Sequence, residues 1–259
     1  MVDTTAVRVD VVTAVHADYA SFLPDAYRSL RDQTHPDWRW FVQFDGWDDA
    51  GVTAALAVTG ALSDDRVSFA GNGESAGPAV TRNIALARTG APYVQNLDAD
   101  DELEPAALTT LLAALRAAPS AGFAAGHARD LLPGGSLRDH PLPVSPGPLP
   151  RGKLAEEWLR DPTRPPPIHP AGVLWHRELV VELGGWTALH GMEDTGLLMA
   201  ASAVADGVLA DAATLRYRKH PRQLSRRRET SKFAGGGAHR TLVRQRVELL
   251  SRGPAWNHR

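Results

Sequence analysis

Short runs rich in β-branched and aromatic residues alternate with helical patterns over the first hundred residues. This alternation is typical of βαβ units around a mostly parallel sheet, and it predicts an α/β fold. We expect strands at 7–15, 38–44, 66–69 and 93–97 and helices at 23–30, 48–62, 78–88 and 105–117. Ligands bind beyond the carboxyl ends of strands in such sheets, so Thr13, Asp45 and the acidic residues 98–101 should converge on one crevice.

The second half of the chain predicts less regular structure. A Pro- and Gly-rich stretch, 133–150, is expected to be an irregular, mobile surface loop, because proline fixes φ and removes a backbone donor. With 259 residues, 43% of them hydrophobic, the chain can bury one large core, so we expect a single domain. The remaining predicted elements are strands at 122–129, 172–175 and 214–217, and helices at 178–183, from Glu193 onward and at 241–250.

Composition excludes several classes of protein. The net formal charge is -2, so the chain as a whole is predicted not to bind nucleic acid. Cysteine is absent from the sequence, which excludes disulfides, thiolate catalysis and Cys-based zinc sites and fits the reducing cytoplasm, the expected location. Since no stretch approaches the roughly 20 apolar residues that span a bilayer, any membrane contact is expected to be peripheral.

An acidic cluster, Asp98-Ala99-Asp100-Asp101, directly follows the fourth predicted strand. Carboxylates at the end of a buried strand lose hydration, and a cation or hydrogen bonds must offset that loss. Mg²⁺ or Mn²⁺ held by one or two carboxylates completes its shell with water and phosphate oxygens, and it can neutralise charge on a departing diphosphate. The alternative interpretation is an acidic turn that caps the helix opened by Pro105.

Five segments follow one another in the order and spacing of known motifs. They are Thr13-Ala14-Val15-His16, Arg31-Asp32-Gln33-Thr34 with Trp38, Phe44-Asp45-Gly46, Thr81-Arg82-Asn83, and Leu97 to Asp101. Together they resemble the inverting family two glycosyltransferases of the GT-A fold. The resemblance implies a mostly parallel, Rossmann-like central sheet flanked by helices. It also implies a nucleotide-sugar-binding half at 1–117, an acceptor-binding half at 118–213 and a basic C-terminal tail and helix at 214–259.

The resemblance also assigns the donor site. Thr13 and Asp45 would contact the nucleobase and ribose, and Arg82 would lie near the donor phosphates. Asp98 would bind the ribose or the metal, and Asp100 would bind the metal, Mn²⁺ or Mg²⁺. The full expected set of donor-binding residues is Thr13, Ala14, Val15, Asp45, Arg82, Asp98 and Ala99. The alternatives are a turn residue before glycine for Asp45 and a solvated helix position for Arg82.

The pair Glu193-Asp194, which follows Gly184-Gly185-Trp186, resembles the acceptor-side "G-G-F … E-D" motif of the family. Asp194 is the expected general base, and Glu193 would orient it or bind acceptor hydroxyls. A carboxylate that removes the proton of the attacking hydroxyl contributes roughly 10²–10⁴-fold to the rate. Trp186 and His190 are the expected acceptor-binding residues. The alternative is plain acidic charge that complements the dipole of a helix.

A basic segment, Arg216 to His220 with Arg222 and Arg226 to Arg228, resembles the family's "Y-R-x-H" segment near the donor diphosphate. Cationic side chains suit phosphate oxygens. His220 is expected to ligate the metal or to bind the diphosphate, and a solvated histidine is the alternative. The arginine run is otherwise a solvated tail or, less favoured, a contact with anionic lipid.

The sequence therefore predicts a metal-dependent, inverting glycosyltransferase of the hexosyltransferase type. Its donor would be a nucleotide diphosphate sugar, with UDP as the first choice, and its acceptor a hydroxyl of a glycan, lipid-linked molecule, small molecule or peptide. A homodimer is compatible with the sequence. Phe44 and Trp47 depart from the family's "D-D-G-S" motif and suggest the alternative of a degenerate protein that binds a sugar nucleotide or glycan without turnover. A sugar nucleotidyltransferase is disfavoured because no Gly-rich loop follows the first strand.

Overall fold

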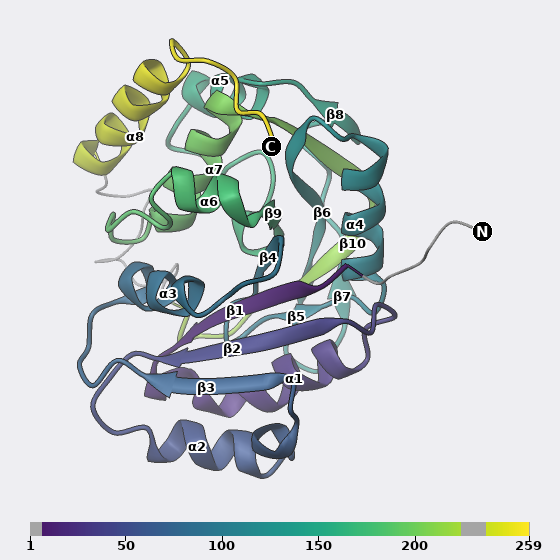
Figure 1. Cartoon of the computed structure of the whole chain (residues 1–259), viewed down its shortest axis with the longest axis vertical. Coiled ribbons are helices and arrows are strands. Elements are labelled where there is room, and N and C mark those ends of the chain that lie inside the picture. Colours follow the sequence, from purple (N-terminus) through teal and green to yellow (C-terminus); the bar gives the residue numbers. More distant parts are fainter. Residues whose placement is uncertain (1–6, 224–236, 259) are drawn as a thin grey trace.

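A single twisted sheet runs through the molecule (Figure 1). The computed structural model describes residues 7–223 and 237–258, and ten strands of this part form the sheet. The main path of the sheet has the order β3-β2-β1-β4-β9-β6-β10-β5, with β7 beside β6 and β8 beside β10. The strand order reverses direction at β1, as in open α/β sheets in which ligands bind at the switch point.

The N-terminal part has the βαβ alternation that the sequence predicts. β1 lies between β2 and β4 and is parallel to both, and β3 continues the parallel set beyond β2. The strands are β1 (Val9–Val15), β2 (Trp38–Phe44), β3 (Val67–Gly71) and β4 (Tyr93–Asn96). The connecting helices are α1 (Leu23–Arg31), α2 (Ala50–Ala57) and α3 (Pro78–Ala87), with the short η1 (Ala17–Phe22) and η2 (Ala61–Ser63).

The second half extends the sheet with one long parallel pair. β6 (Ala121–Leu131) runs parallel to β10 (Asp206–Arg218). The other strands are short and antiparallel to their neighbours: β5 (Glu102–Leu103), β7 (Leu137–Arg138), β8 (Gly147–Leu149) and β9 (Leu174–His176). The helices are α4 (Ala107–Ala117), α5 (Lys153–Arg160), α6 (Arg177–Glu182), α7 (Glu193–Val204) and α8 (Gly237–Leu250), with the turn η3 (Pro170–Gly172). The expected mostly parallel α/β sheet is thus confirmed for its long pairings.

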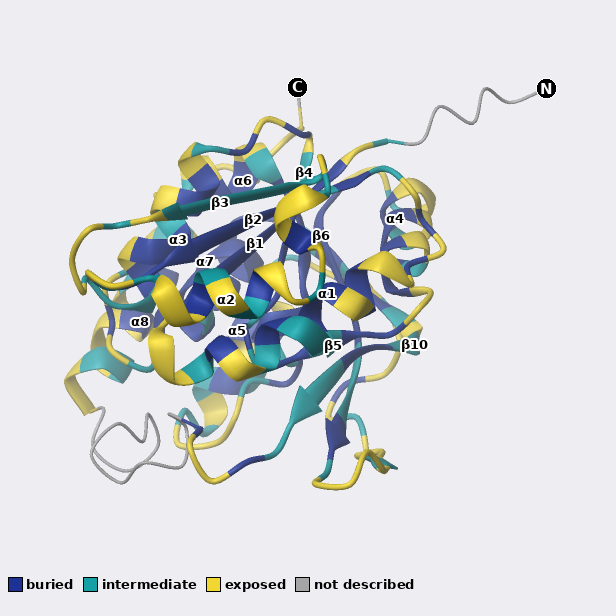
Figure 2. Cartoon of the chain, turned by 90° about the horizontal axis from the view of Figure 1, so that it is seen from below, coloured by how far each residue is buried: buried dark blue, intermediate teal, exposed yellow. Residues whose placement is uncertain are grey.

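Helices cover both faces of the sheet, and each face has its own apolar core. Side chains of α1, α2 and α4 pack on one face, and those of α3, α5, α6, α7 and α8 pack on the other. Figure 2 shows buried strands between helices whose outer surfaces are exposed. Burial on both faces explains the nearly continuous apolar character of β1 and β2, which is typical of parallel strands.

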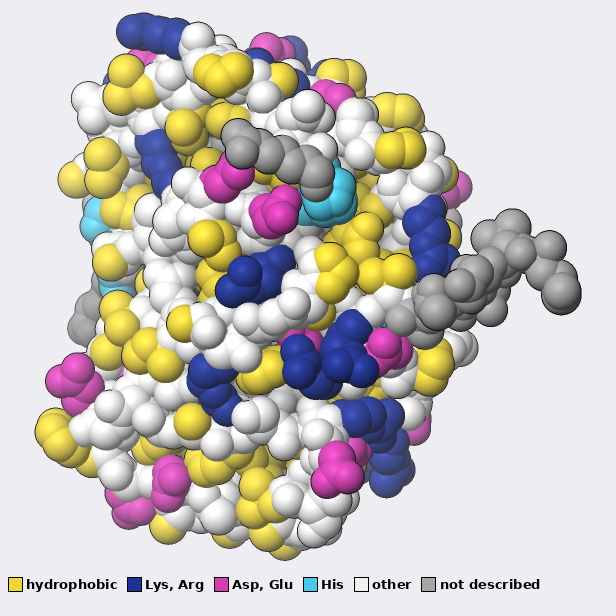
Figure 3. Space-filling model, in the orientation of Figure 1, with side chains coloured by type: hydrophobic (Ala, Val, Ile, Leu, Met, Phe, Trp, Pro, Cys, Tyr) yellow, Lys and Arg dark blue, Asp and Glu magenta, His cyan; other side chains and the backbone are white. Residues whose placement is uncertain are grey.

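The molecular surface carries charges of both signs. On the face shown in Figure 3, Lys and Arg side chains lie among acidic and apolar ones. Several arginines near the amino ends of the strands are paired, such as Arg39 with Asp10 and Arg66 with Asp64. Within residues 7–223 and 237–258, no helix is long and apolar enough to cross a bilayer.

The stretch 133–150 is more ordered than its composition predicts. It contains β7, which pairs with β6, and β8, which pairs with β10, so the expectation of an irregular loop is wrong for these segments. Proline and glycine restrict the two strands to two and three residues. Buried Asp130 lies where β6, β7 and β10 meet, and its carboxylate contacts Arg138, His140 and Lys219 at 2.6, 2.9 and 2.9 Å.

We predict that Asp130 stabilises this junction in a pH-dependent way. Burial opposes ionisation, but hydrogen bonds from Arg138, Lys219 and His140 lower the pKa of Asp130 to about 2. A lowered carboxylate pKa stabilises the fold above the unfolded value and loses that effect as the pH falls toward the folded value. Asp130→Asn should therefore cost about 2 kcal/mol in urea unfolding at pH 7, and the difference from wild type should shrink between pH 4 and pH 2.

Asp139→Asn is the matched control, because Asp139 forms a surface ion pair with Arg129 and its side chain is 73% exposed. Such pairs contribute little. Equal effects of the two substitutions, or a loss in Asp130→Asn that does not change with pH, would contradict the assignment.

Candidate active site

A cleft of about 360 Å³ opens at the carboxyl ends of β1, β2 and β4. This volume lies within the range of small-molecule sites. Its first wall comes from the loops after these strands and from α3, and includes Ala14, Val15, His16, Asp18, Tyr19, Asp45, Pro78, Arg82, Asp98, Ala99 and Asp100. Its second wall comes from η3, the start of α7 and the end of β10, and includes His169, Pro170, Ala171, His190, Gly191, Glu193, Asp194, Tyr217 and Gln223. The topology thus brings together residues that are far apart in the sequence.

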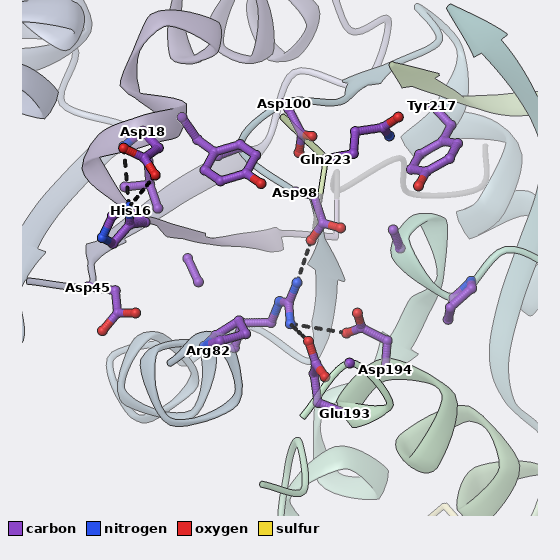
Figure 4. A pocket seen from close by; sticks show the side chains of 18 of the residues that line it. His16, Asp18, Asp45, Arg82, Asp98, Asp100, Glu193, Asp194, Tyr217 and Gln223 are labelled. Carbon is purple, nitrogen blue, oxygen red and sulfur yellow. Dashed lines mark hydrogen bonds and ion pairs between the residues drawn. The ribbon is translucent and has the colours of Figure 1, made fainter. Parts of the chain in front are cut away.

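Arg82 joins the two walls of this cleft. Its Nη2 donates to Asp98 Oδ1 at 2.6 Å. Its Nη1 lies 3.3 Å from Asp194 Oδ1 and 3.7 Å from Glu193 Oε1. Figure 4 shows the guanidinium between the carboxylate of Asp98 and the acidic pair at the start of α7. A buried cation therefore connects the acidic cluster after β4 to the expected base.

The charge of Arg82 is held by its acidic neighbours. The side chain is 7% exposed. Burial would lower the pKa of Arg82, but Asp194, Asp98 and Glu193 together raise it well above its ordinary value. Among the described residues, six carboxylates line the cleft with this single guanidinium. The cleft is therefore negatively charged around one fixed positive group.

The acidic cluster divides into cleft-facing and structural residues. Asp98 and Asp100 line the cleft. Asp100 Oδ2 lies 2.8 Å from His220 Nε2. Burial, followed by the charge of Asp98, raises the pKa of Asp100, while His220 lowers it. Asp101 does not line the cleft: it is buried and accepts the backbone N–H of Arg218 at 2.9 Å.

His220 is held in place by aromatic side chains of η1. The ring of Phe22 lies 4.6 Å from the imidazole of His220, and Tyr19 contacts it edge to face at 5.9 Å. Tyr19 Oη also donates to the carbonyl of Arg222 at 2.8 Å. The loop after β1 and the loop after β10 are therefore joined beside Asp100.

The basic segment expected near the diphosphate is largely neutralised within the protein. Arg216 pairs with Glu102 and Glu104, Arg218 pairs with Asp25 and Glu102, and Lys219 pairs with Asp130. The expectation that these cations face phosphate is therefore not supported by their placement. Arg226 to Arg228 lie outside the described residues.

Asp45 and Thr13 differ in what they offer to a ligand. Asp45 lines the cleft, and its Oδ1 accepts the N–H groups of Ala76 and Gly77 at 2.6 and 3.2 Å, just before α3. Thr13 lies outside the cleft lining and is fully buried. Its hydroxyl donates to the carbonyl of Leu97 at 2.7 Å and accepts from Trp40 Nε1 at 2.8 Å. The expected nucleotide contact by the Thr13 side chain is therefore corrected to a core hydrogen bond between strands.

The two expected acceptor-binding residues, His190 and Trp186, differ in their exposure. His190 is exposed and lines the cleft. Trp186 is 2% exposed and belongs to the apolar core, so its expected contact with an acceptor is not supported by its position. The cleft is also lined by Tyr217, from the segment that resembles the "Y-R-x-H" motif, and by four residues without a predicted role: Asp18, Tyr19, His169 and Gln223. Asp18 and Tyr19 could have been found from their position just after the first strand, whereas Gln223 gave no signal.

Two comparisons found known proteins that are similar to this chain. Residues 10–181 match the family model described as glycosyl transferase family 2. The structure of Staphylococcus aureus TarS residues 1–349 is similar, with a TM-score of 0.65 and 14% identity over 94% of this chain and 71% of that chain. Its complex with UDP-GlcNAc also gives a TM-score of 0.65 at 14% identity, over 94% of this chain and 72% of that one. S. aureus TarS gives 0.63 at 14% identity over 91% of this chain and 42% of its own. No curated protein matches significantly.

Removing the charge of Arg82 should destabilise the fold. Arg82→Met leaves Asp98, Glu193 and Asp194 without their shared cation, and loss of one partner of a buried ion pair typically costs about 3 kcal/mol or more. The loss is measured by urea unfolding at pH 7.

Arg88→Met on the same helix is the control, because the guanidinium of Arg88 bonds neutral partners: Val42 O, Gln43 Oε1 and Ser68 Oγ. Its loss of stability at pH 7 should be smaller than that of Arg82→Met, because no charged partner is left without its cation. An Arg82→Met protein as stable as wild type at pH 7 would show that the ion-pair cluster does not hold the cleft together.

Proposed function

The chain belongs to glycosyl transferase family 2, and from this premise we propose that it transfers a sugar from a UDP-sugar to an acceptor hydroxyl with inversion at the anomeric carbon. The observation that carries this proposal is the cleft in which Arg82 lies between Asp98 and Asp194, with Asp100 in the same lining. UDP is the first choice because the similar S. aureus TarS structures include complexes with UDP and UDP-GlcNAc.

The donor occupies the first wall of the cleft in this proposal. The backbone around Ala14 and Val15, together with Asp45, would bind the nucleoside, and the diphosphate would lie towards Asp98 and Asp100. Six carboxylates repel a bare diphosphate, so this location requires a compensating cation. We therefore include a divalent ion, Mn²⁺ or Mg²⁺, in the donor complex.

Asp100 and His220 fit the role of metal ligands. Asp100 Oδ2 lies 2.8 Å from His220 Nε2, so these two side chains are close enough that they would hold one ion together. The described residues contain no group of three or more His, Asp or Glu side chains suited to a metal ion. Two protein ligands suffice when phosphate oxygens and water complete the shell. A bound ion would neutralise charge on the departing diphosphate.

Asp194 is the proposed general base. The acceptor oxygen attacks the anomeric carbon from the side opposite the diphosphate, the bond from that carbon to the phosphate oxygen breaks, and the hydroxyl proton passes to Asp194. Asp194 and Glu193 begin α7 on the second wall of the cleft, opposite the loops that would hold the donor. Exposed His190 on the same wall is available to the acceptor. Arg82 keeps both carboxylates oriented towards the donor side.

A second candidate function is binding of a sugar nucleotide without turnover. It is favoured by Phe44, which is buried in the core, and by Trp47, which is 82% exposed, because neither supplies the polar group that the family motif has there. Release of UDP from UDP-GlcNAc in the presence of Mn²⁺ separates the two functions. Binding without any release or transfer from UDP-, GDP- or dTDP-sugars would support the binding protein.

We predict that Asp194→Asn spares donor affinity but lowers turnover by at least about a hundredfold, because only the proton acceptor is lost. Turnover is measured as UDP release from UDP-GlcNAc with Mn²⁺, with water as the acceptor, and donor affinity by calorimetry with UDP. Exposed Asp65 provides the control variant Asp65→Asn. A hundredfold loss in the control, or full turnover in Asp194→Asn, would remove Asp194 as the base.

Asp100→Ala should abolish the Mn²⁺-dependent part of UDP binding, because it removes the carboxylate proposed to contact the ion. The measurement is the thermal shift produced by UDP with and without Mn²⁺, since a ligand specific to the folded state raises its apparent stability. Asp65→Ala should respond like wild type. An Mn²⁺-dependent shift of wild-type size in Asp100→Ala would place the ion elsewhere.

A further inference from the structure

Asn83, the neighbour of Arg82 on α3, holds the backbone of the second half of the chain. Its Nδ2 donates to the carbonyl of Trp186 at 2.9 Å, and its Oδ1 accepts the N–H of Trp186 at 2.9 Å. A side-chain amide that satisfies both backbone groups of one residue fixes the position and the direction of that residue. Asn83 does not line the cleft, so this contact lies outside the site described above.

Gly185 allows this close approach. Its φ of +71° lies in the left-handed region, and a Cβ at this position would overlap Asn83 Oδ1. The positive φ favours glycine because other residues rarely adopt this backbone conformation. The lack of space for a Cβ beside Asn83 favours glycine as well. Asn83 and Gly185 therefore form one contact, which we call the α3 clamp: the two hydrogen bonds from Asn83 to Trp186 and the glycine that permits them.

The α3 clamp is connected to the start of α7. Trp186 is anchored in the core, and Leu189 and Met192 are buried in the same core cluster. The next residue after Trp186, Thr187, packs against the first turn of α7: a Cβ on Gly196 would lie 2.9 Å from Thr187 Oγ1. Consecutive turns, from Leu189 N to Thr187 O and from Met192 N to Leu189 O, join the segment to Glu193 and Asp194. The clamp thus sets where α7 begins.

Arg82 and Asn83 act on the same helix start from adjacent positions. Arg82 contacts the carboxylates of Asp194 and Glu193, and Asn83 fixes the backbone that leads to them. Arg82 links this helix start to the donor side through its hydrogen bond to Asp98, whereas the hydrogen bonds of Asn83 go to the backbone of Trp186. Loss of the clamp should therefore displace the base and leave the donor site in place.

We infer that Asn83 and Gly185 are positioning residues for the reaction: they place Asp194 against the donor, so that turnover depends on them and donor binding does not. This inference rests on the proposed function, in which Asp194 is the base. Displacement of a reacting group by about 1 Å can cost up to a hundredfold in rate. Removal of the amide also leaves both backbone groups of Trp186 without their partner.

The test compares Asn83→Ala, Gly185→Ala and the control Ile84→Ala in the full chain. Ile84 is the next residue along α3 and is 37% exposed, so its truncation reports on the helix alone. For each variant, UDP affinity with Mn²⁺ is measured by calorimetry, UDP release from UDP-GlcNAc gives kcat, and hydrogen exchange is followed in peptides that cover 184–196 and 93–98.

We expect kcat to fall at least about tenfold in Asn83→Ala and in Gly185→Ala. UDP affinity should stay within about twofold of wild type, and Ile84→Ala should match wild type. Exchange should accelerate in 184–196, where the Trp186 amide loses its acceptor, and stay unchanged in 93–98. A parallel fall of UDP affinity and kcat would mean general loosening and would overturn the inference, as would an unchanged kcat or unchanged exchange in 184–196. If the wild-type chain releases no UDP, the proposed function fails, and the exchange of 184–196 alone decides whether the α3 clamp holds the start of α7.

Discussion

The ion-pair cluster around Arg82 is the interaction on which the rest of the site depends. One buried guanidinium contacts Asp98 after β4 and the pair Glu193 and Asp194 at the start of α7. Without that cation, three carboxylates at the meeting point of two walls would repel one another in a poorly hydrated place. The same contact therefore joins the two walls of the cleft and holds the proposed base beside the proposed donor site.

The sheet explains why these groups can meet. β1 lies between β2 and β4, so the loops that follow all three strands open on the same edge, and α3 brings Arg82 and Asn83 to that edge from the other side of the sheet. The second half returns through β9, which is antiparallel to β4, and this pairing places η3 and α7 opposite the first wall. A negatively charged cleft with one fixed cation suits the proposed ligand, a sugar nucleotide bound together with a divalent ion.

The sequence predicted the fold well where the spacing of apolar residues and the residues at strand ends clearly mark the elements. Strand 38–44 agrees with β2, and Asp98 and Asp100 line the cleft as the topology required, whereas Asp101 is buried outside it. The errors have physical causes. Proline and glycine in 133–150 predicted a loop, because proline lacks a backbone N–H donor. The strands β7 and β8 are only two and three residues long, so each needs few backbone donors. Thr13 and Trp186 lie in motifs near the site, yet their side chains point into the core. Their placement depends on residues that are distant in sequence, such as Trp40 and Asn83.

The proposed donor complex is tested most directly by a crystal of the protein soaked with UDP and MnCl₂, with the anomalous signal of manganese used to locate the ion. A manganese peak is expected beside Asp100 and His220, with a diphosphate between that peak and Arg82 and the uridine along the loop that follows β1. Manganese bound elsewhere, or a nucleotide outside the cleft while Asp98 and Asp100 face only solvent, would contradict it.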